Sequence, residues 1–345
     1  MKVKSISAME PMVAELPKSA SEYYAITTAD LSRIAADVYC IEDALITIDY
    51  SLWHNIKYSI ADKHGNWLPE INIHDEIAPL FNTVKVTGNV AFVDDRFAVF
   101  NICHFLFDKL GRVAELDGLA IDSYFLLLDH PYYNQVFSIL GLNKTDLENA
   151  TENIITYSFE KLYVSTSTCR FRHPGFNFRP EVMGILSELK SKSAIDQQEL
   201  DLGKRIYIDR KGTAARDIVN QDALNAVLDK YGFVSVIFED FGFSEQVKIV
   251  QEAEILLGVH GAGMSNAMFC DSADFKLLEI FPPMCATSDY WKLASAFNVH
   301  YDAYIAYDLE MPRPDYSTWQ HNVKYNRRNI LIDQEEFDRF LALNT

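Results

Sequence analysis

The chain has 345 residues, of which 49% are hydrophobic and 23% are charged. Its 31 Lys and Arg residues are outnumbered by 49 Asp and Glu residues, so the net charge of -18 repels nucleic-acid phosphate and anionic lipid over most of the surface. At about 150 residues per domain, the length predicts two domains that each bury a core. The five cysteines are scattered without a C-x-x-C pair, which argues against a zinc knuckle or a disulfide framework.

The first half of the chain predicts an irregular, strand-rich beginning followed by an α/β pattern. Strand-like stretches occur at 44–48, 84–93, 124–128 and 161–164, and helical spacing occurs at 102–116 and 134–140. A polar segment rich in Ser and Lys at 190–203 marks the crossing to the second half. We therefore predict an N-terminal domain over 1–190 and a C-terminal domain over 191–345.

The second half alternates strands and helices with regular spacing. Strands are predicted at 205–209, 233–238, 254–258, 276–281 and 299–305, and helices at 221–231, from 245, from 261 and at 289–297. Such alternation indicates right-handed βαβ units and a parallel, doubly wound, Rossmann-like sheet. Asp333 and Glu336 have the spacing of a capping box before a last helix, which is a candidate to pack back on the N-terminal domain.

The sharpest motif is Gly258-Val259-His260-Gly261-Ala262-Gly263-Met264-Ser265-Asn266, which follows a predicted strand and opens a helix. Small residues let the backbone approach a ligand, and the positive end of a helix favours an anion such as a diphosphate. The residues expected to bind it are His260, Gly261, Ala262, Gly263 and Asn266. The alternative is that the glycines only permit tight helix–sheet packing and that His260 is a satisfied buried histidine.

Two more charged residues are predicted at the same edge of the sheet. Arg210 follows the strand 205–209, and Glu279 lies near the end of the strand 276–281. Because the carboxyl ends of parallel strands share one edge, these side chains and His260 are expected to form one site. Arg210 suits a diphosphate and Glu279 suits ribose hydroxyls, so the set predicts a nucleotide-diphosphate site. Taken singly, Arg210 fits a surface ion pair and Glu279 fits an acid at the edge of the core.

Positive charge is concentrated in one stretch of the chain. Lys161 to Arg216 holds eleven basic and six acidic residues, which is a local charge of +5 in a chain of -18. Such a run is usually a solvated face, and it is also what the positive wall of a small-anion site requires.

Three sequence elements together resemble glycosyltransferase family 61. They are an Arg-x5-Arg-x3-Asn element (Arg210, Arg216, Asn220), an E-D-x3-S-E-Q element (Glu239 to Gln246) and the G-x-H-G-A-G element, in family order and spacing. The resemblance implies a GT-B fold, an α/β architecture of two Rossmann-like domains facing each other across a cleft. The donor nucleotide is then expected on the C-terminal domain, and the acceptor is expected to enter from the N-terminal one.

The same resemblance implies an inverting, metal-independent glycosyltransferase. The donor would be a nucleotide sugar, a UDP-sugar in first place, acting as co-substrate with no other cofactor, and Arg210 and Arg216 would stabilise the leaving diphosphate. The acceptor would be a glycan or lipid-linked glycan, as in the bacterial branch that makes capsule or O-antigen polysaccharide. No apolar signal segment follows Lys2 and Lys4, so a cytoplasmic protein with at most peripheral membrane association is expected.

The segment from His104 to Arg112 resembles the family's H-x3-D-x-L-P-R element, with Gly111 in place of the proline. On a helix, His104, Asp108 and Arg112 would share one polar face. Inverting transfer needs a group that removes the acceptor hydroxyl's proton, and Asp108, or His104 supported by Asp108, is the candidate base. The alternative is a solvent-facing pair worth about 0.2–0.5 kcal/mol. The next carboxylates to consider are Glu115 and Asp117.

Two other classes of function stay open. A non-catalytic nucleotide-sugar-binding protein of the same pathway would bind the donor without transferring or hydrolysing the sugar. A nicotinamide-dependent dehydrogenase would carry its glycine fingerprint after the first strand of the dinucleotide fold, whereas the glycines here follow the third predicted strand. Glu279 lies near the place of a ribose-binding acid, so spacing leaves this class open, and comparing NADH with UDP in a binding titration would separate the two.

Overall fold

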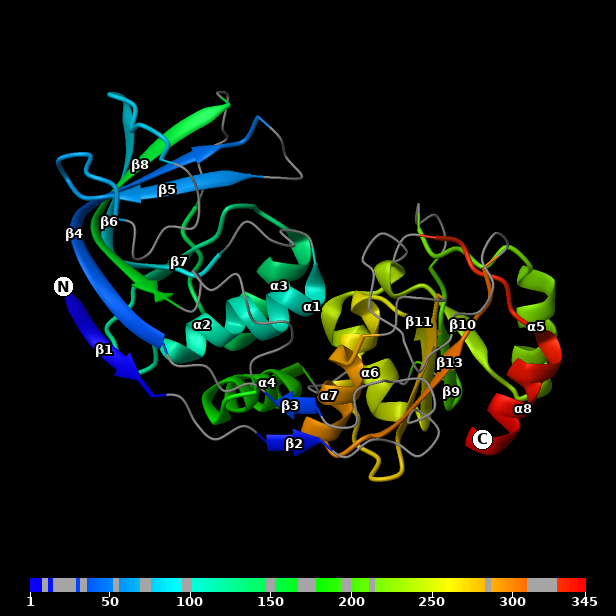
Figure 1. Cartoon of the computed structure of the whole chain (residues 1–345). Helices are drawn as coiled ribbons and strands as arrows, with labels where there is room; N and C mark the ends of the chain where they lie inside the picture. The colour runs from blue at the N-terminus through cyan, green and yellow to red at the C-terminus, as the bar shows by residue number, and fades with distance from the viewer. Residues whose placement is uncertain are drawn as a thin grey trace. The chain divides into compact units, whose positions relative to one another are not determined.

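The computed structural model forms two compact units (Figure 1), the first comprising Met1–Pro11 and Ser32–Lys192 and the second Met12–Leu31 and Ser193–Thr345. The structure describes residues 1–7, 12–14, 29–31, 36–51, 56–68, 76–94, 101–146, 153–166, 178–193, 200, 202–210, 215–282, 287–308 and 328–345. Within these ranges, no helix has both the length and the apolar character needed to cross a membrane.

The first unit is built on a mixed sheet. Its strands are β1 (Lys2–Ile6), β4 (Ala36–Asp49), β5 (Lys57–Ala61), β6 (Thr83–Phe92), β7 (Ser123–Phe125) and β8 (Ile154–Ser165). Their order is β1-β4-β8-β6-β7, and β5 also pairs with β4. Strand β6 is parallel to β7 and β8, whereas β4 runs antiparallel to β1, β5 and β8.

The prediction of a Rossmann-like first half therefore holds only for the three parallel strands. Parallel neighbours need a crossover, and helical segments lie between β6 and β7 and between β7 and β8. The long strand β4 instead is mostly buried or half-buried, with Glu42 and Asp43 exposed, and it pairs with antiparallel neighbours on both sides. The aromatic core of this unit gathers on the sheet, where the ring of Phe125 lies 5.1 Å from that of Tyr157 and 5.2 Å from that of Phe159.

The helical crossover after β6 contains a wide turn. Asn101 caps its start, because its Oδ1 accepts hydrogen bonds from the N–H groups of Cys103 and His104 at 2.9 and 3.2 Å. The segment begins as α1 (Ile102–His104), passes through a π-helical turn (Phe105–Lys109) and ends as α2 (Leu110–Glu115). The predicted helix over 102–116 is thus present, but it is interrupted by a turn of a kind that is rare and often found at functional sites.

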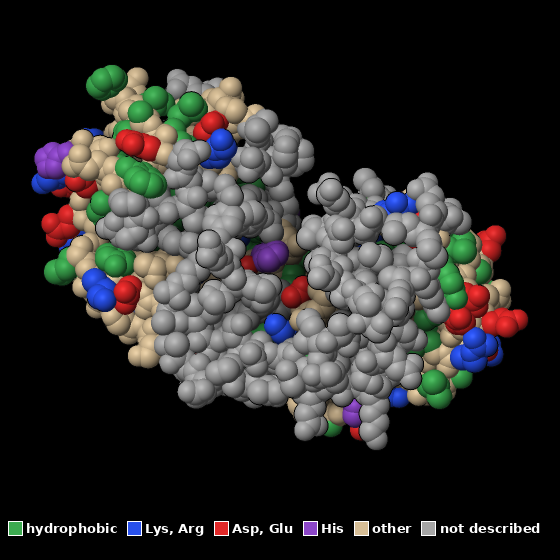
Figure 2. All heavy atoms as spheres, viewed as in Figure 1, with side chains coloured by type: hydrophobic (Ala, Val, Ile, Leu, Met, Phe, Trp, Pro, Cys, Tyr) green, Lys and Arg blue, Asp and Glu red, His purple; other side chains and the backbone are tan. Residues whose placement is uncertain are grey.

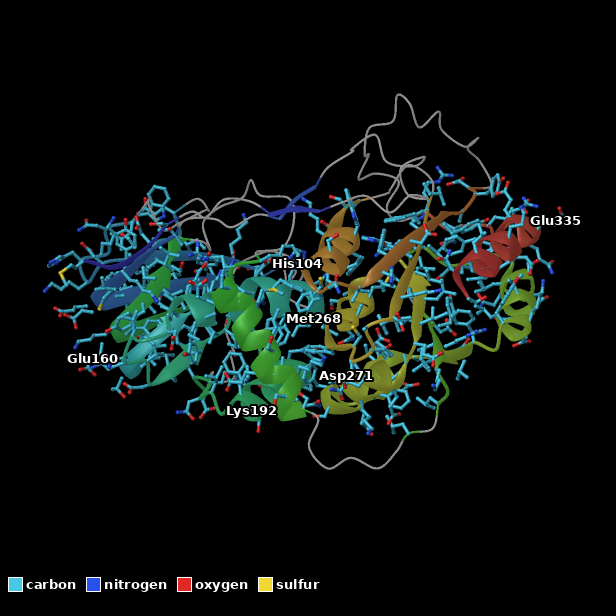
Figure 3. The ribbon with its side chains drawn as sticks, turned by 90° about the horizontal axis from the view of Figure 1, so that it is seen from below. His104, Glu160, Lys192, Met268, Asp271 and Glu335 are labelled. Atoms are coloured by element: carbon cyan, nitrogen blue, oxygen red, sulfur yellow. The ribbon has the colours of Figure 1, made fainter. Side chains whose placement is uncertain are left out.

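Two further helices complete the first unit. They are α3 (Pro131–Leu140), which separates β7 from β8, and α4 (Pro180–Ser193). His130 caps α3, since its ring nitrogen accepts from the N–H of Tyr132 at 3.3 Å, and Gly141 ends the helix in the left-handed region with φ of 70°. Lys192, labelled in Figure 3 at the end of α4, donates to the carbonyl of Leu140 at 3.4 Å.

The second unit has the parallel, doubly wound sheet predicted from its alternating periods. Strands β9 (Arg205–Ile208), β10 (Val234–Val236), β11 (Ile255–Val259), β12 (Lys276–Phe281) and β13 (His300–Ile305) pair in the order β10-β9-β11-β12-β13, all parallel. The helices are α5 (Gln221–Lys230), α6 (Phe243–Glu252), α7 (Asp289–Ala296) and α8 (Gln334–Asn344). Helices α5 and α8 lie on one face of the sheet, and α6 and α7 lie on the other (Figure 1). The short antiparallel pair β2 (Met12–Ala14) and β3 (Ala29–Leu31) contacts α7.

The last helix belongs to the second unit. Asp333 caps it as expected, because its Oδ1 accepts from the N–H of Glu336 at 2.9 Å. Phe337 and Leu341 on its apolar face are fully buried in the same core as Leu224 of α5. Its buried apolar residues thus pack within the second unit, and the expected packing on the N-terminal domain stays a prediction.

The strand order of the second unit has one point of reversal. The chain moves from β9 outward to β10 and then returns to place β11 on the other side of β9. In doubly wound sheets, ligands bind at the carboxyl ends of the two strands that flank such a switch point. The loops after β9 and β11 are therefore the place to look for a site.

Candidate functional site

The two loops at the switch point are joined by Arg210 and His260. Arg210 follows β9, and its Nη1 donates to the backbone carbonyl of His260, just after β11, at 2.7 Å. Burial lowers the pKa of the Arg210 guanidinium, although Tyr290, Glu239 and Asp217 oppose the shift. An arginine stays charged under such a shift. This edge of the sheet therefore holds a partly buried positive charge, as the sequence predicts.

Gly261 is needed because Arg210 lies against it. Its φ of 179° is extended backbone that other residues also adopt, so conformation does not require glycine here. A Cβ at this position would overlap Nη1 of Arg210. Gly263 differs, since its Cβ would lie 3.4 Å from Ile208 Cγ2 and 3.6 Å from Phe238 Cδ2. Tight packing therefore accounts for Gly263, and the approach of the guanidinium accounts for Gly261.

We expect Gly261→Ala to weaken binding of a nucleoside diphosphate by about tenfold or more, because the new methyl group displaces the guanidinium and a charge-assisted contact is worth about 1.5–3 kcal/mol. Calorimetry with UDP measures the loss. Gly184→Ala is the matched control, since a Cβ at Gly184 in α4 meets no atom within 4 Å. Equal affinity of the Gly261→Ala variant and the wild type would show that the guanidinium position is irrelevant to the ligand.

The segment that follows His260 is a 3₁₀ helix rather than the α-helix that the pattern suggested. It spans Ala262–Phe269, with Gly261 as its first flanking residue. The first N–H groups of such a helix have no partner within it and suit an anion. Ser265 is fully buried, and its hydroxyl donates to the carbonyl of Ala262 at 2.6 Å, which ties the first turn together. Gly261 and Ala262 remain half-buried at the start of the turn.

His260 is held by a chain of polar groups. Its Nδ1 lies 2.5 Å from Oε1 of Glu279, and Oε2 of Glu279 accepts the hydroxyl of Tyr301 at 2.6 Å. The ring also stacks on Phe281, with 5.4 Å between the ring centroids. Glu279 is fully buried, and this burial raises the pKa of its carboxyl, although its bonds to His260 and Tyr301 act in the opposite direction.

The expected contact of Glu279 with ribose hydroxyls is not supported by this arrangement. Both carboxylate oxygens are taken by side chains of the protein, and the residue has no exposed surface. Glu279 therefore positions His260. The chain register explains the difference: Glu279 lies within β12, paired with Ala303 of β13, so its side chain points into the packed layer that also contains the Tyr301 hydroxyl.

Asn266 is also buried rather than placed for a ligand. Its Nδ2 donates to Oε1 of Gln246 and to the carbonyl of Gly263, both at 3.2 Å, and the residue is 0% exposed. Gln246 in turn donates to the carbonyls of Phe238 and Phe241 at 2.8 and 3.1 Å. Through its Nδ2, Asn266 joins the 3₁₀ helix to α6, and its predicted contact with the nucleotide sugar stays a prediction.

This network also explains the E-D-x3-S-E-Q element. Glu245 accepts the N–H of Gly242 at 2.7 Å and so starts α6, while Gln246 fixes the loop that precedes it. The element therefore builds the support beneath the glycine turn.

Arg216 and Asn220 follow Arg210 in sequence. Arg216 is half-buried and has φ of 64°, in the left-handed region that few non-glycine residues adopt, at a cost of about 1–3 kcal/mol. Asn220 does not cap α5 through its side chain. It donates to the carbonyl of Ile332 at 2.8 Å and accepts the Ile332 N–H at 2.9 Å. The Asn of the motif thus anchors the loop that carries Arg216.

The positive stretch from Lys161 to Arg216 does not act as one wall. Arg179 is buried and donates to the carbonyl of Ser7, and Arg205 donates to that of Tyr231 at 2.6 Å. Lys192 and Lys204 form ion pairs with Glu188 and Glu254. Arg170, Arg172 and Lys211 lie outside the described residues. Acidic and basic side chains are interspersed on the described surface in Figure 2. Arg210 is the member seen to reach the switch point.

The first unit carries the predicted His104–Asp108 pair, with His104 at the end of α1 and Asp108 in the π-helical turn. His104 Nδ1 and Asp108 Oδ2 are 2.6 Å apart, and their side chains are 44% and 28% exposed. Figure 3 labels His104 at the start of this helix. The pair is thus formed and accessible to a ligand.

The remaining polar residues of this helix are placed differently from the prediction. Arg112 leaves the polar face, because the extra residue of the wide turn rotates later positions by about 100°. It is 5% exposed and donates to the carbonyl of Val93 at 3.0 Å. Glu115 is buried and accepts the hydroxyl of Ser165 at 2.6 Å. It is therefore a poor substitute for Asp108, whereas Asp117 is exposed.

Tyr290, Tyr301 and Gln246 support the site through contacts that their positions in the sequence do not indicate. The hydroxyl of Tyr290 on α7 donates to the carbonyl of Gly261 at 2.6 Å. Tyr301 reaches Glu279 from the neighbouring strand. Each lies 20 to 29 residues from its partner in the chain, and the packing of strands and helices brings them together. Among the described residues, no group of three or more His, Cys, Asp or Glu side chains is placed to hold a metal ion.

The chain is similar in sequence to several known proteins and to one protein family. The EGF domain-specific O-linked N-acetylglucosamine transferase of Drosophila melanogaster is 30% identical over 158 residues, which cover 44% of this chain and 29% of that protein. The protein of the same name from Bos taurus is 29% identical over 142 residues, covering 39% of this chain and 26% of its own length. The one from Mus musculus is 32% identical over 104 residues, which cover 28% of this chain and 19% of that protein.

The matched region thus spans less than a third of these curated relatives. Residues 102–274, half of the chain, match the family described as Glycosyltransferase 61. This region begins at the helix of His104 and Asp108 and runs past Arg210, His260 and the glycine turn. The chain belongs to glycosyltransferase family 61.

Proposed function

We propose that this chain is an inverting, metal-independent glycosyltransferase that moves a sugar from a nucleotide-activated donor to an acceptor hydroxyl. The observation that carries the proposal is the cluster of Arg210, His260 and Gly261 at the switch point of the second unit. Family membership supports the reaction class. In this account the two units are the two halves of a GT-B enzyme, with the donor on the second and the acceptor on the first.

The second unit supplies what a departing diphosphate needs. Fixed positive charge and preorganised N–H groups stabilise the charge that develops on the leaving group. Arg210 is held by the carbonyl of His260, so its guanidinium stays in place before the ligand arrives. The N–H groups at the start of the 3₁₀ helix, the Arg216 side chain and His260 complete the set, and a UDP-sugar is the first donor to test.

The first unit supplies the candidate base. A carboxylate that accepts the acceptor hydroxyl's proton must be accessible and close to a group that stabilises it. Asp108 meets both conditions, because it is partly exposed and hydrogen-bonded to His104. Asp108 is therefore assigned as the base and His104 as its partner.

Arg210→Ala and His260→Ala test the donor site. Each is expected to weaken UDP binding by about tenfold to a hundredfold, because each removes a charged or polar contact to the diphosphate worth about 1.5–3 kcal/mol. Lys204→Ala is the matched control, since Lys204 is an exposed cation at the opposite end of β9 that pairs with Glu254. Calorimetry that gave the wild-type affinity for both site variants would remove the donor site from the second unit.

The acceptor has two candidate classes. One is the glycan of a bacterial surface polysaccharide, assembled in the cytoplasm, as the sequence resemblance implies. The other is a hydroxyl on an EGF-like protein domain with N-acetylglucosamine as the sugar, which the names of the curated relatives favour. Incubation of the chain and UDP-N-acetylglucosamine with a folded EGF-like domain, and separately with a surface oligosaccharide, separates the two by the mass added to each acceptor.

A further inference from the structure

The polar atoms of the His260 ring are not equivalent. Nδ1 is committed to Glu279 at 2.5 Å, and among the described residues Nε2 has no hydrogen-bond partner. The side chain of His260 is 12% exposed, whereas that of Glu279 is 0% exposed. The stack on Phe281 and the bond from Tyr301 to Glu279 fix the orientation of the pair. The ring therefore offers a ligand one nitrogen, Nε2.

Counting protons shows what Nε2 can do. A contact as short as that between Nδ1 and Oε1 contains one proton, whichever atom carries it. With no further proton on the pair, Nε2 is a bare lone pair that can only accept a hydrogen bond. With one more proton, either the ring is an imidazolium or the carboxyl is neutral and donates to Nδ1. In both cases Nε2 carries the N–H and donates.

We propose that Glu279 and Tyr301 are positioning residues that make His260 present Nε2–H to the diphosphate of the donor, so that the pair must hold its additional proton for the donor to bind. This inference rests on the proposed function. Beyond the proposed function, the protonation state of the His260–Glu279 pair and the residues that control that state are assigned. Glu279 acts here without touching the ligand.

The surroundings of the pair favour retaining that proton. Burial raises the pKa of Glu279, and Asp289 at the start of α7 acts in the same direction, while His260 and Tyr301 lower it. The other groups that face His260 are Tyr290 of α7, whose ring centroid is 5.4 Å away, and Arg210, which contacts its backbone carbonyl. Because His260 and Glu279 share a proton, the two side chains gain or lose the additional proton as one unit.

The test is donor affinity as a function of pH. UDP-N-acetylglucosamine is the probe, because the diphosphate of an intact nucleotide sugar has no proton that titrates near neutral pH, unlike that of free UDP. Calorimetry between about pH 6 and about pH 8.5 spans the range in which histidine pairs titrate. The wild-type affinity is expected to fall by about tenfold for each pH unit once the pair has lost its additional proton.

Two variants separate this inference from a purely structural role. In Glu279→Gln the amide nitrogen donates to Nδ1 while its oxygen accepts from Tyr301, so Nε2 carries a hydrogen at every pH. Binding is then retained and its pH dependence is lost. Tyr301→Phe removes a donor to the carboxylate, so the pair keeps its proton to higher pH and the midpoint moves upward. Tyr307→Phe is the matched control, because it removes another tyrosine–carboxylate bond, the 3.0 Å bond to Glu336.

Each outcome bears on a different claim. A wild-type affinity that does not change with pH, or a Glu279→Gln variant with the wild-type profile, would overturn the inference and leave the donor site standing. Absence of binding by the folded wild type at every pH, with no response to other nucleotide sugars, would remove the proposed donor site and this inference with it. If Glu279→Gln fails to fold, as judged by circular dichroism, the Tyr301→Phe variant is the test. A midpoint of its pH dependence above that of the wild type supports the inference, and an unchanged midpoint overturns it.

Discussion

Asp108→Asn is expected to lower glycosyl transfer by about 10²–10⁴-fold while leaving donor affinity unchanged, because an amide cannot take the proton of the acceptor hydroxyl. The side chain is partly exposed and bonded to His104, so the substitution should preserve the fold. Turnover with saturating donor and calorimetry with UDP separate the two effects. His104→Gln, which keeps a hydrogen-bond partner for Asp108, is expected to lose less activity than Asp108→Asn.

Near-normal turnover by a correctly folded Asp108→Asn variant would contradict this assignment. Asp117 would then be the next carboxylate to examine, since it is exposed just after α2. Glu115 is a weaker substitute than the sequence suggested, because it is buried and bonded to Ser165. A fall in donor affinity together with turnover would instead place Asp108 among the binding residues.

Lys109→Met is expected to lower the free energy of unfolding of the first unit by about 3–5 kcal/mol. Lys109 is 1% exposed and its Nζ lies 2.6 Å from Oδ1 of Asp94, which has no exposed surface. Oδ2 of Asp94 also accepts the N–H of Leu127 at 2.8 Å, so the carboxylate joins the loop after β7 to the end of the π-helical turn. Removing the ammonium leaves a buried carboxylate without its cation, and urea denaturation followed by circular dichroism measures the cost.

The matched control is Lys204→Met, which removes an exposed lysine from an ion pair of the same 2.6 Å length. It is expected to cost far less, because solvent screens an exposed pair. Adding Asp94→Asn to Lys109→Met should recover part of the loss, since an amide can still accept the Leu127 N–H without a buried charge. Equal free energies of unfolding of Lys109→Met and Lys204→Met would show that the buried ion pair stabilises the fold no more than the exposed one.

The second unit was the more predictable part of the fold. Each of its helices and strands carries its own hydrophobic period, and β12 has the predicted bounds of 276–281. The edge shared by Arg210 and His260 followed from the parallel order alone. The roles of Glu279 and Asn266 did not follow, because a carboxylate or an amide near a strand end looks the same in sequence whether it faces a ligand or a buried partner. Only the neighbouring strand and helix, with Tyr301 and Gln246, decide that.

The first unit was less predictable for two reasons. No helices separate its antiparallel strands, so the sequence pattern does not indicate how β4 pairs with its three neighbours. The π-helical turn cannot be predicted from the spacing of apolar residues. It nevertheless sets which side chains share a face, so that His104 pairs with Asp108 while Arg112 is buried. The acid–base pair could be named from its spacing, whereas the face on which it lies required the structure.

The central claim is tested most directly by the release of nucleoside diphosphate from nucleotide sugars. The chain is incubated with UDP-N-acetylglucosamine and other nucleotide sugars, with and without acceptor, and the nucleoside diphosphate is quantified by chromatography. We predict release that depends on an acceptor for the wild type, and none above background for Arg210→Ala and Asp108→Asn. A folded wild-type chain that binds nucleotide sugars yet releases no nucleoside diphosphate with any acceptor would contradict the claim and identify a non-catalytic binding protein.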